Sequence, residues 1–356
     1  MIELDGSYLE GGGQLVRNAL ALSAVTGKAF TVTDIRAGRK KPGLKAQHLH
    51  CVEALRKLCY AESVGVELGS DKLDFTPGKI TPRTVPADIG TAGSVSLLLQ
   101  SVLLPAMLSG GKVRFKLKGG TTGKWAMPFD YLSEVLVPQL RRFADIECKL
   151  VRRGYYPKGG GEVEVHVKSR YTWDELQNDP EIAPRLVLKE QGHLVQIKGV
   201  SHAAKELEKA QVAERQARAA KHVLSKLNVP VQISAQYADT LCAGSGITLW
   251  AVFSLAEDDV DVQNPIRLGA DALGERGKRA EAVGEEAARE LLAEIESGAA
   301  VDKHLADNLI PIIAVFGGEI KVSELTDHTK TGVYVARKFL GDVLEVDEEK
   351  KIIKRK

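Results

Sequence analysis

A histidine near the end of the chain lies in the polar segment Asp327-His328-Thr-Lys330-Thr. The residues around it predict a turn between a strand and a helix, and an imidazole in such a turn is placed to act as a nucleophile or a general base. A lone surface histidine is the simpler interpretation unless other polar turns converge on it. The sequence has no Ser-His-Asp set, paired glutamates or cysteine nucleophile that competes with His328 for that chemistry.

A basic loop that begins at Ile35 and ends at His48 is the second candidate. A proline and glycines interrupt it, so it is not an ordinary helix face. Rigid basic loops bind phosphates, and arginine adds bidentate contacts, so we favour phosphate binding over a solvated loop. His48 and His50 have no acidic or cysteine partner nearby, so we do not expect a metal-binding pair. The five cations within ten residues are Arg36, Arg39, Lys40, Lys41 and Lys45.

Two glycine-rich segments are the remaining candidates. Glu10-Gly-Gly-Gly-Gln14-Leu-Val-Arg17 leads into a predicted helix, where glycines let a phosphate approach the backbone amides. It matches neither a Walker loop nor GxGxxG, and tight turning explains the glycines equally well. Glu10 is a candidate ligand for a divalent metal, although an acid at a helix N-terminus is the simpler interpretation.

The other glycine-rich segment runs from Gly119 to Tyr131 and places glycines beside aromatic residues. This composition suits a nucleotide base that stacks on an aromatic ring. Packing of Phe129 and Tyr131 in the core is an equally good interpretation.

The elements that position these residues repeat three times along the chain. Residues 13–43, 94–123 and 304–332 each predict an apolar helix, a glycine stop, an alternating strand and a polar turn. The glycines just past the helices predict left-handed C-caps, and they are Gly27, Gly111 and Gly318. If the repeats share an axis, the three turns converge on one cleft.

Each block continues with an amphipathic helix and a pair of short strands. The predicted second helices are residues 44–60, 128–144 and 333–340. We therefore expect an α/β fold of the α+β type, built from three strand-helix-strand-helix-strand-strand modules with one smaller α/β domain inserted. The predicted division is residues 1–182 for two repeats, 183–298 for the insert and 299–356 for the third repeat, which carries His328.

Composition gives weaker information about partners. The chain has 356 residues, which suits about two domains, and a net charge of +2, which excludes a strongly polyanionic or polycationic protein. Residues 1–160 carry 23 basic and 14 acidic side chains, whereas the remainder carries 26 and 33. This asymmetry suggests a phosphate-rich partner on the N-terminal side, although solvated basic faces are common.

The four cysteines contain no C-x-x-C pair, which argues against a zinc ribbon or a disulfide framework and favours a reducing compartment. The sequence shows no secretory signal segment and no run of about 18 apolar residues, so we expect no membrane span. The predicted location is therefore cytoplasmic, or nuclear if the source has a nucleus.

At the same clusters the sequence resembles the RNA 3′-terminal phosphate cyclase family. The resemblance extends in order across almost the whole chain. It is carried by DGSYLEGGGQLVRNALALS, IRAGRKKPGLKAQHL, residues 90–106, RGYYPKGGG at 153–161, and HLADNLIP ahead of Asp327 and His328. The fold of that family, three repeats with one inserted domain, agrees with the organisation described above.

The resemblance implies an ATP-dependent reaction. Cyclases of the family use ATP and a divalent metal, Mg²⁺ or Mn²⁺, to adenylate a histidine with release of pyrophosphate, and His328 occupies that position. AMP then passes to an RNA 3′-phosphate, and the neighbouring 2′-hydroxyl displaces it to leave a 2′,3′-cyclic phosphate. The implied partners are ATP and RNA with a 3′-terminal phosphate. The sequence does not reveal the oligomeric state.

The resemblance also implies roles for individual residues. Those that match ATP contacts are Gln100, Pro128, Tyr131, His304, Leu305, Ala306, Asp307 and Asn308. Those expected near phosphates or the RNA end are Arg17, Arg36, Arg39, Lys41 and Gln47, and Glu10 matches a metal-linked acid. Three residues depart from the pattern: His304 replaces a frequent Tyr, and Gly332 and Arg337 stand where relatives have an Asn and a carboxylate.

Two other functions remain open. A catalytically silent family member that acts in ribosomal-RNA assembly is one, and the presence of His328 argues against it because silent relatives typically lack that histidine. An enolpyruvyl transferase also uses repeated α/β modules and phosphate-binding cations, but it has no use for a nucleophilic histidine or an ATP site.

Overall fold

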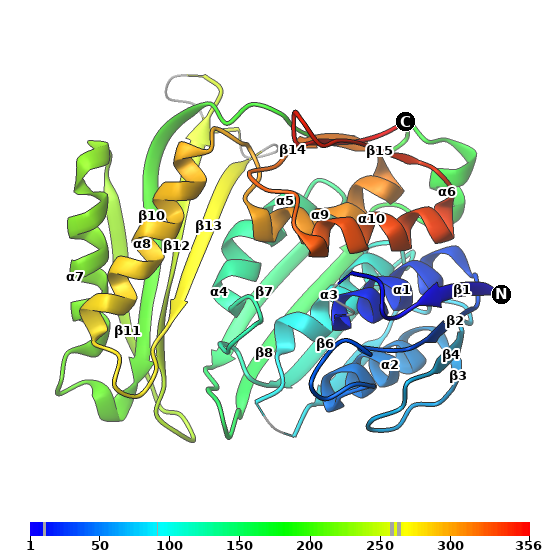
Figure 1. The fold of residues 1–356 in the computed structure, drawn as a ribbon, viewed down its shortest axis with the longest axis horizontal. Coiled ribbons are helices and arrows are strands. Elements are labelled where there is room, and N and C mark those ends of the chain that lie inside the picture. The colour runs from blue at the N-terminus through cyan, green and yellow to red at the C-terminus, as the bar shows by residue number, and fades with distance from the viewer. Residues whose placement is uncertain (10–11, 91, 257–259, 262–264) are drawn as a thin grey trace.

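The computed structural model describes residues 1–9, 12–90, 92–256, 260–261 and 265–356. The described chain forms four sheets of four strands, each of mixed direction, with helices packed against them (Figure 1). The predicted α+β class is confirmed. No helix in these ranges combines the length and the apolar character needed to cross a membrane.

The first repeat forms a sheet in the order β1-β2-β4-β3, in which β1 and β2 are parallel. Its helices fill the connections between the strands, because a parallel pair needs a crossover. The elements are β1 (Ile2–Asp5), α1 (Gly13–Thr26), β2 (Phe30–Thr33), α2 (Ala46–Cys59), β3 (Glu62–Val64) and β4 (Leu73–Thr76).

The second repeat has the same plan, in the order β5-β6-β8-β7. Side chains of β6 alternate strictly between exposed and buried, as the sequence KVRFKLKG predicts. Pro138 lacks the N–H that would bond to Glu134, and the second helix widens into a π-turn, Leu132–Leu136, just before it. The elements are β5 (Thr84–Asp88), α3 (Val95–Met107), β6 (Lys112–Gly119), α4 (Phe129–Tyr131), α5 (Val137–Leu140), β7 (Ala144–Arg152) and β8 (Gly161–Ser169), followed by the short helix α6 (Trp173–Asn178).

The third repeat is interrupted after its first strand. β9 pairs in parallel with β14, so residues that we placed in the insert from 183 onward include a strand of the third sheet. The sheet order is β15-β16-β14-β9. The elements are β9 (Leu186–Leu188), α9 (Lys303–Phe316), β14 (Gly318–Lys321), α10 (Asp327–Leu340), β15 (Leu344–Asp347) and β16 (Ile352–Arg355).

Two local predictions in these repeats need correction. Helix α10 begins at Asp327, so His328 lies in the first turn of the helix rather than in a turn before residue 333. Gly27 has the predicted left-handed backbone, with φ of 70°, but Gly111 and Gly318 are not the C-caps of their helices. The C-cap of α3 is Leu108, with φ of −113°, and the C-cap of α9 is Gly317, whose φ of 83° and ψ of 159° are not those of a left-handed cap.

The segment between β9 and α9 forms the fourth sheet, in the order β11-β10-β12-β13. Its two helices lie side by side along one face of this sheet (Figure 1). Gly284 permits their close contact, because a Cβ built there would lie 2.1 Å from the carbonyl oxygen of Gln216. The elements are β10 (His193–Ala204), α7 (Val212–Leu224), β11 (Val231–Ala238), β12 (Ser245–Ser254), β13 (Ile266–Leu273) and α8 (Ala280–Glu296).

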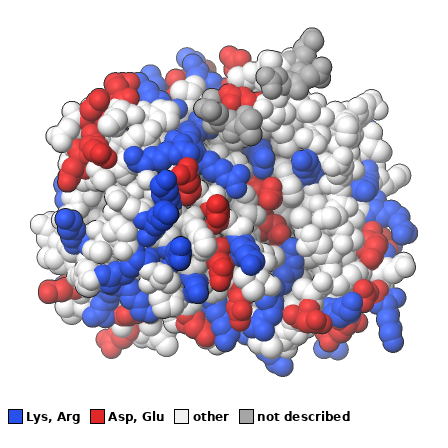
Figure 2. Space-filling view, turned by 180° about the vertical axis from the view of Figure 1, so that it is seen from behind, with Lys and Arg blue, Asp and Glu red and all other residues white. Residues whose placement is uncertain are grey.

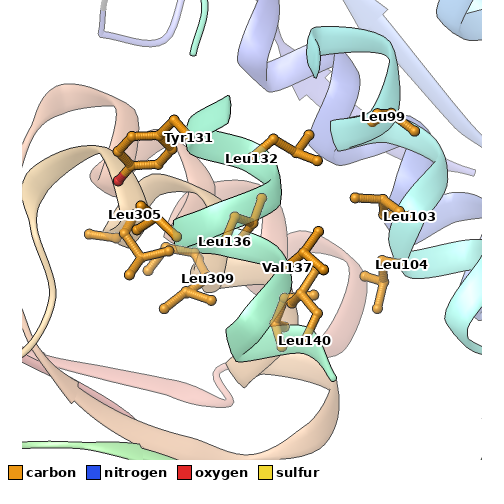
Figure 3. Packing of buried hydrophobic residues seen from close by; sticks show 14 of the residues in the cluster. Leu99, Leu103, Leu104, Tyr131, Leu132, Leu136, Val137, Leu140, Leu305 and Leu309 are labelled. Atoms are coloured by element: carbon orange, nitrogen blue, oxygen red, sulfur yellow. The ribbon is translucent and has the colours of Figure 1, made fainter. Parts of the chain in front are cut away.

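The three repeats pack cyclically around a helical centre. The first helix of each repeat contacts the second helix of another: α1 packs on α10, α3 on α2, and α9 on the π-turn that follows α4. Figure 3 shows leucines of α3, of the helical stretch 129–140 and of α9 meeting in the buried core. This arrangement brings the N-termini of helices from different repeats together, as the shared axis predicted.

Candidate active site at the start of α10

His328 is the second residue of α10 and is half-buried. Thr326 caps this helix, because its hydroxyl accepts a hydrogen bond of 3.0 Å from the backbone N–H of Thr329. The amides of a helix N-terminus and the helix dipole favour anions. The imidazole therefore lies where a phosphate group would be stabilised.

Gly12 and Arg39 lie beside His328. A Cβ built on Gly12 would be 3.6 Å from Cε1 of His328 and 3.8 Å from Nη2 of Arg39. Gly12 also precedes α1, so a second helix N-terminus faces the imidazole. Three of the polar clusters singled out in the sequence thus converge here: the glycine-rich loop, the basic loop and the histidine turn.

Behind Gly12, a buried arginine meets a neutral histidine. A Cβ on Gly13 would lie 2.1 Å from Nε2 of His48 and 3.1 Å from Nη1 of Arg17. Burial lowers the pKa of Arg17 to about 10. Burial, followed by the charges of Arg17, Arg36 and Lys45, lowers the pKa of His48 to about 3, so His48 is uncharged at neutral pH.

A hydrogen-bonded chain links the three repeats inside the site. Nε of Arg17 donates to Oε1 of Gln100 at 2.8 Å, and Nε2 of Gln100 donates to Oδ1 of Asn308 at 2.8 Å. Asn308 in turn donates to the carbonyl oxygen of His304 at 2.7 Å. One helix of each repeat contributes to this chain, namely α1, α3 and α9, so the predicted residues Arg17, Gln100 and Asn308 come together.

Asp307 connects α9 to the start of α10. Its Oδ1 accepts hydrogen bonds from the hydroxyls of Thr326 at 2.8 Å and Thr329 at 2.7 Å. Burial raises the pKa of Asp307 to about 6, and the two hydroxyls and the charge of His328 limit the rise. Asp307 therefore fixes the turn that carries His328, and its charge changes in the mildly acidic range.

The basic loop is held by its own side chains. Nη1 of Arg36, a residue with φ of 60°, donates to the carbonyl oxygens of Lys41 at 3.2 Å and Gly43 at 3.3 Å. Nζ of Lys45 donates to the carbonyl oxygen of Pro42 at 2.6 Å. Arg36 and Lys45 thus shape the loop, whereas Arg39 and Lys41 are exposed.

Several residues predicted to contact ATP are packed in the interior instead. Tyr131, Leu305 and Ala306 are at most 1% exposed, and Pro128 is buried before α4. The hydroxyl of Tyr131 donates to Oδ1 of Asp302 at 2.6 Å, and Asp302 caps α9. Tyr131 is therefore placed to hold the start of α9. His304, in contrast, is exposed there.

Gln47 lies at the start of α2. A Cβ on Gly93 would be 3.1 Å from Oε1 of Gln47. Both polar atoms of its amide are buried and lack a hydrogen-bond partner in the described chain. Such atoms are costly to leave unpaired, so this side chain is a candidate for binding a ligand group.

The metal prediction falls on Glu10, which lies outside the described residues. Among the residues that are described, no three His, Cys, Asp or Glu side chains gather as metal ligands. Asp307 supplies a carboxylate at the site, and Mg²⁺ is often held by one or two carboxylates together with the substrate's phosphates.

The two departures after His328 lie away from the imidazole. A Cβ on Gly332 would be 3.2 Å from the side chain of Ile310, so Gly332 lets α10 approach α9. Arg337, in the last turn of α10, donates to the carbonyl oxygen of Leu344 at 2.8 Å and pairs with Asp342 at 3.2 Å. Gly332 thus serves helix packing, and Arg337 ties the end of α10 to the segment that follows it.

Sequence reasoning missed the residues that orient this site. Thr326 and Thr329 were visible only as hydroxyls near His328, and Asp302 carried no motif at all. The pattern Thr326-x-x-Thr329 was a usable capping signal. The hydroxyl of a threonine just before a helix commonly accepts a hydrogen bond from the backbone N–H three residues later. The link from Asp302 to Tyr131 spans 171 residues, so nothing local indicated it.

Two helix N-termini, an arginine and an imidazole thus meet in an α/β protein of three repeats, which defines a phosphate-binding protein with a potential nucleophile. A family model described as RNA 3′-terminal phosphate cyclase matches residues 8–346. The chain therefore belongs to the RNA 3′-terminal phosphate cyclase family.

Individual relatives agree with that assignment along nearly their full length. A protein of Pyrococcus abyssi named RNA 3′-terminal phosphate cyclase is 46% identical over 351 residues, covering 98% of this chain and 96% of the relative. Relatives of the same name from Thermococcus onnurineus and Archaeoglobus fulgidus are 47% and 42% identical. They cover 98% and 99% of this chain, and 96% and 100% of their own lengths.

Proposed function

We propose that this protein converts the 3′-terminal phosphate of RNA to a 2′,3′-cyclic phosphate in an ATP-dependent reaction, through a covalent histidine-AMP intermediate on His328. The observation that carries the proposal is the meeting of His328, Gly12 and Arg39 at two helix N-termini. The names of the relatives supply the substrate.

In the first step an imidazole nitrogen of His328 attacks the α-phosphorus of ATP. A P–N bond forms, the bond to the bridging oxygen breaks, and pyrophosphate leaves. Arg39 and the first-turn amides of α10 offset the negative charge that develops on the phosphoryl oxygens. Asp307 keeps the imidazole in place by fixing the hydroxyls of Thr326 and Thr329.

In the second step an oxygen of the RNA 3′-phosphate attacks the same phosphorus, and the P–N bond breaks. The neighbouring 2′-hydroxyl then attacks the activated 3′-phosphate, AMP leaves, and the cyclic phosphate forms. Covalent catalysis of this kind divides one difficult displacement into easier ones. Arg17, Arg39 and Lys41 are the cations that we assign to the phosphates.

Gln100, His304, Asp307 and Asn308 are the predicted ATP residues that we retain as contacts. The exposed imidazole of His304 suits stacking on adenine, whereas Tyr131 and Pro128 act from the interior by positioning α9 and α4. A divalent metal would neutralise phosphate charge when bound. We assign Glu10 to it, with Mg²⁺ or Mn²⁺ as the ion.

We place the protein in the cytoplasm, and its four free thiols support a reducing compartment. The alternative, a catalytically silent protein that binds ribosomal RNA, shares the fold and the basic loop. It differs in one observable: a silent protein does not take up AMP from ATP.

The test is incubation with ATP labelled at the α-phosphate, with Mg²⁺ or Mn²⁺. We expect a label on the protein that is labile in acid and stable in alkali, and that is absent from His328→Ala. The matched control is His222→Ala, since His222 lies on α7 of the insert, away from the site. Equal labelling of His328→Ala would overturn the mechanism, and RNA binding without any labelling of the wild type would favour the silent protein.

A further inference from the structure

A large cavity separates the second repeat from the insert. Its volume is 1250 Å³, and it is lined on one side by residues 92–94 and the loop after β6, and on the other by the ends of β12, β13 and α8. Sites for one small ligand usually measure about 300–1,000 Å³. The cavity is therefore larger than one such ligand requires.

Aromatic rings border this cavity and are exposed to solvent. The side chain of Trp125 is 89% exposed and that of Tyr156 is 77% exposed. Nζ of Lys124 lies 5.4 Å from the centre of the Trp125 ring. Exposed aromatic surface at the rim of a cavity marks a binding surface rather than core packing.

The cations of the lining are mostly paired with carboxylates. Lys124 pairs with Glu275, Arg215 and Arg279 pair with Glu281, and Lys278 pairs with Glu286. The described residues that line the cavity include one carboxylate, Glu275, and five cations. Among the ion pairs of the described chain, none involves Arg276. The five cations are Lys124, Arg215, Arg276, Lys278 and Arg279.

Gln47 connects the cavity to the candidate active site. It lines the cavity, and its amide atoms are buried without a partner in the described chain. The next residue, His48, lies against Gly13 and Arg17, and Gly12 lies against His328. The start of α2 therefore lies between the imidazole and the cavity.

We propose that this cavity binds the single-stranded part of the RNA just upstream of the 3′-terminal phosphate, an inference that rests on the proposed function. Exposed rings beside a cation suit single-stranded nucleic acid that is bound without reading its sequence, because bases stack on the rings and the cation contacts the backbone. Trp125 and Tyr156 take the bases, Arg276 contacts a phosphate, and Gln47 bonds to the nucleotide at the entrance.

The test measures RNA binding in the absence of ATP, so that its result does not depend on adenylation. Fluorescent oligoribonucleotides with a 3′-phosphate, two and ten nucleotides long, are titrated by anisotropy. We expect the wild type to bind the ten-nucleotide RNA at least about tenfold more tightly than the two-nucleotide RNA, because more bases stack. Trp125→Ala should remove most of that difference.

Arg276→Ala should weaken binding of the longer RNA about equally for every sequence and lower the slope of log affinity against log salt by about one. Tyr60→Ala and Arg218→Ala are the matched controls. Tyr60 is an exposed ring with Arg83 over it, and Arg218 is an exposed cation of the insert, and neither lines the cavity.

The inference would be overturned if Trp125→Ala kept the wild-type preference for the ten-nucleotide RNA. It would also be overturned if the two control variants weakened RNA binding as much as Trp125→Ala and Arg276→Ala do. Equally tight binding of a blunt duplex of the same sequence would also overturn it, because stacking on Trp125 needs unpaired bases. Failure of the proposed function is distinguishable: it appears as absent AMP labelling of the wild type, in an assay that contains no RNA.

Discussion

The starts of α4 and α10 are equivalent positions in two repeats, yet their residues have different roles. The second residue of the helix is Asp130 in α4 and His328 in α10. Asp130 is buried and held by both terminal nitrogens of Arg153, at 2.6 and 2.9 Å. His328 is half-buried and lies beside Gly12 and Arg39.

Electrostatics explain the contrast. Burial acts to raise the pKa of Asp130, but the hydrogen bonds and charge of Arg153 keep it below its usual value, so the carboxylate stays charged. The start of α4 therefore carries an internal anion with its own counterion. The start of α10 carries a nucleophile beside a cation, which suits an anionic substrate. The same backbone plan thus gives a structural ion pair in one repeat and a candidate reaction site in another.

The largest effect should come from moving the histidine between repeats. Gln47 is the residue of α2 equivalent to His328. We expect His328→Ala to lower AMP labelling by more than about 10³-fold, because it removes the nucleophile. Adding Gln47→His should not restore it, since Gly12 and Arg39 lie beside position 328. Labelling of the imidazole introduced at position 47 of the double variant, detected by peptide mapping, would mean that the repeat plan alone is sufficient.

The ion pair at α4 should dominate stability. Arg153→Ala leaves Asp130 charged and buried, and breaking a buried pair in this way costs about 3–5 kcal/mol of unfolding free energy. Arg170→Ala is the matched control, because its pair with Asp145 is about half exposed and such pairs contribute about 0–1 kcal/mol. Urea unfolding of both variants measures the difference, and equal midpoints would contradict the assignment.

The sequence predicted the repeats because their pattern is local. Apolar helices with glycine stops and strands of period two are visible within about 30 residues. The convergence of His328 with the basic loop followed from that repetition, and the structure confirms it. The three-residue strand β9 was not predictable as part of the third sheet, because its partner β14 follows only after the whole insert.

The charge asymmetry of the sequence was misleading in part. Lys116 and Lys118 of β6 lie opposite Glu164 and Glu162 of β8, so cations of the first 160 residues face carboxylates beyond residue 160. Figure 2 shows Lys and Arg gathered on one face of the molecule with carboxylates among them. Cross-strand pairing, and not only phosphate binding, thus accounts for the basic excess. The strand register determines which cations face carboxylates, and the composition of the sequence gives no information about that pairing.

Asp307 should make stability depend on pH at the reaction site. Its pKa is raised from 3.8 to about 6, so the folded state holds the proton more tightly than the unfolded state. The bound proton therefore stabilises the folded state by up to about 3 kcal/mol. This stabilisation is complete below about pH 4 and is lost as the pH rises through 6. Asp307→Asn keeps an acceptor for Thr326 and Thr329 but does not titrate.

We therefore expect the unfolding free energy of Asp307→Asn to rise relative to the wild type between pH 4 and 6, and the difference to level off above that range. Urea unfolding at four pH values measures it. Asp88→Asn, whose carboxylate is exposed and has a lowered pKa, is the control and should show no such gain. A difference that is constant with pH would mean that Asp307 is charged throughout.

The smallest effects should come from adding single methyl groups to adjacent glycines. Gly13→Ala places a Cβ 2.1 Å from Nε2 of His48, a ring that is buried and fixed because its Nδ1 accepts from the backbone N–H of Lys45. The ring has to move, which costs about 1–3 kcal/mol of unfolding free energy and exceeds the gain of up to about 1 kcal/mol from helix propensity.

Gly12→Ala meets only ordinary contacts, 3.6 Å from His328 and 3.8 Å from Arg39, and the backbone of Gly12 is extended, with φ of −81°. It should leave stability within about 0.5 kcal/mol, as for a surface substitution. Because that methyl group lies against the imidazole, AMP labelling should nevertheless slow. Gly13→Ala should mainly lower the unfolding free energy, whereas Gly12→Ala should mainly slow AMP labelling. Urea unfolding and labelling rates therefore distinguish the two variants. A Gly12→Ala protein that labels at the wild-type rate would place the incoming phosphate on the other side of His328, away from α1.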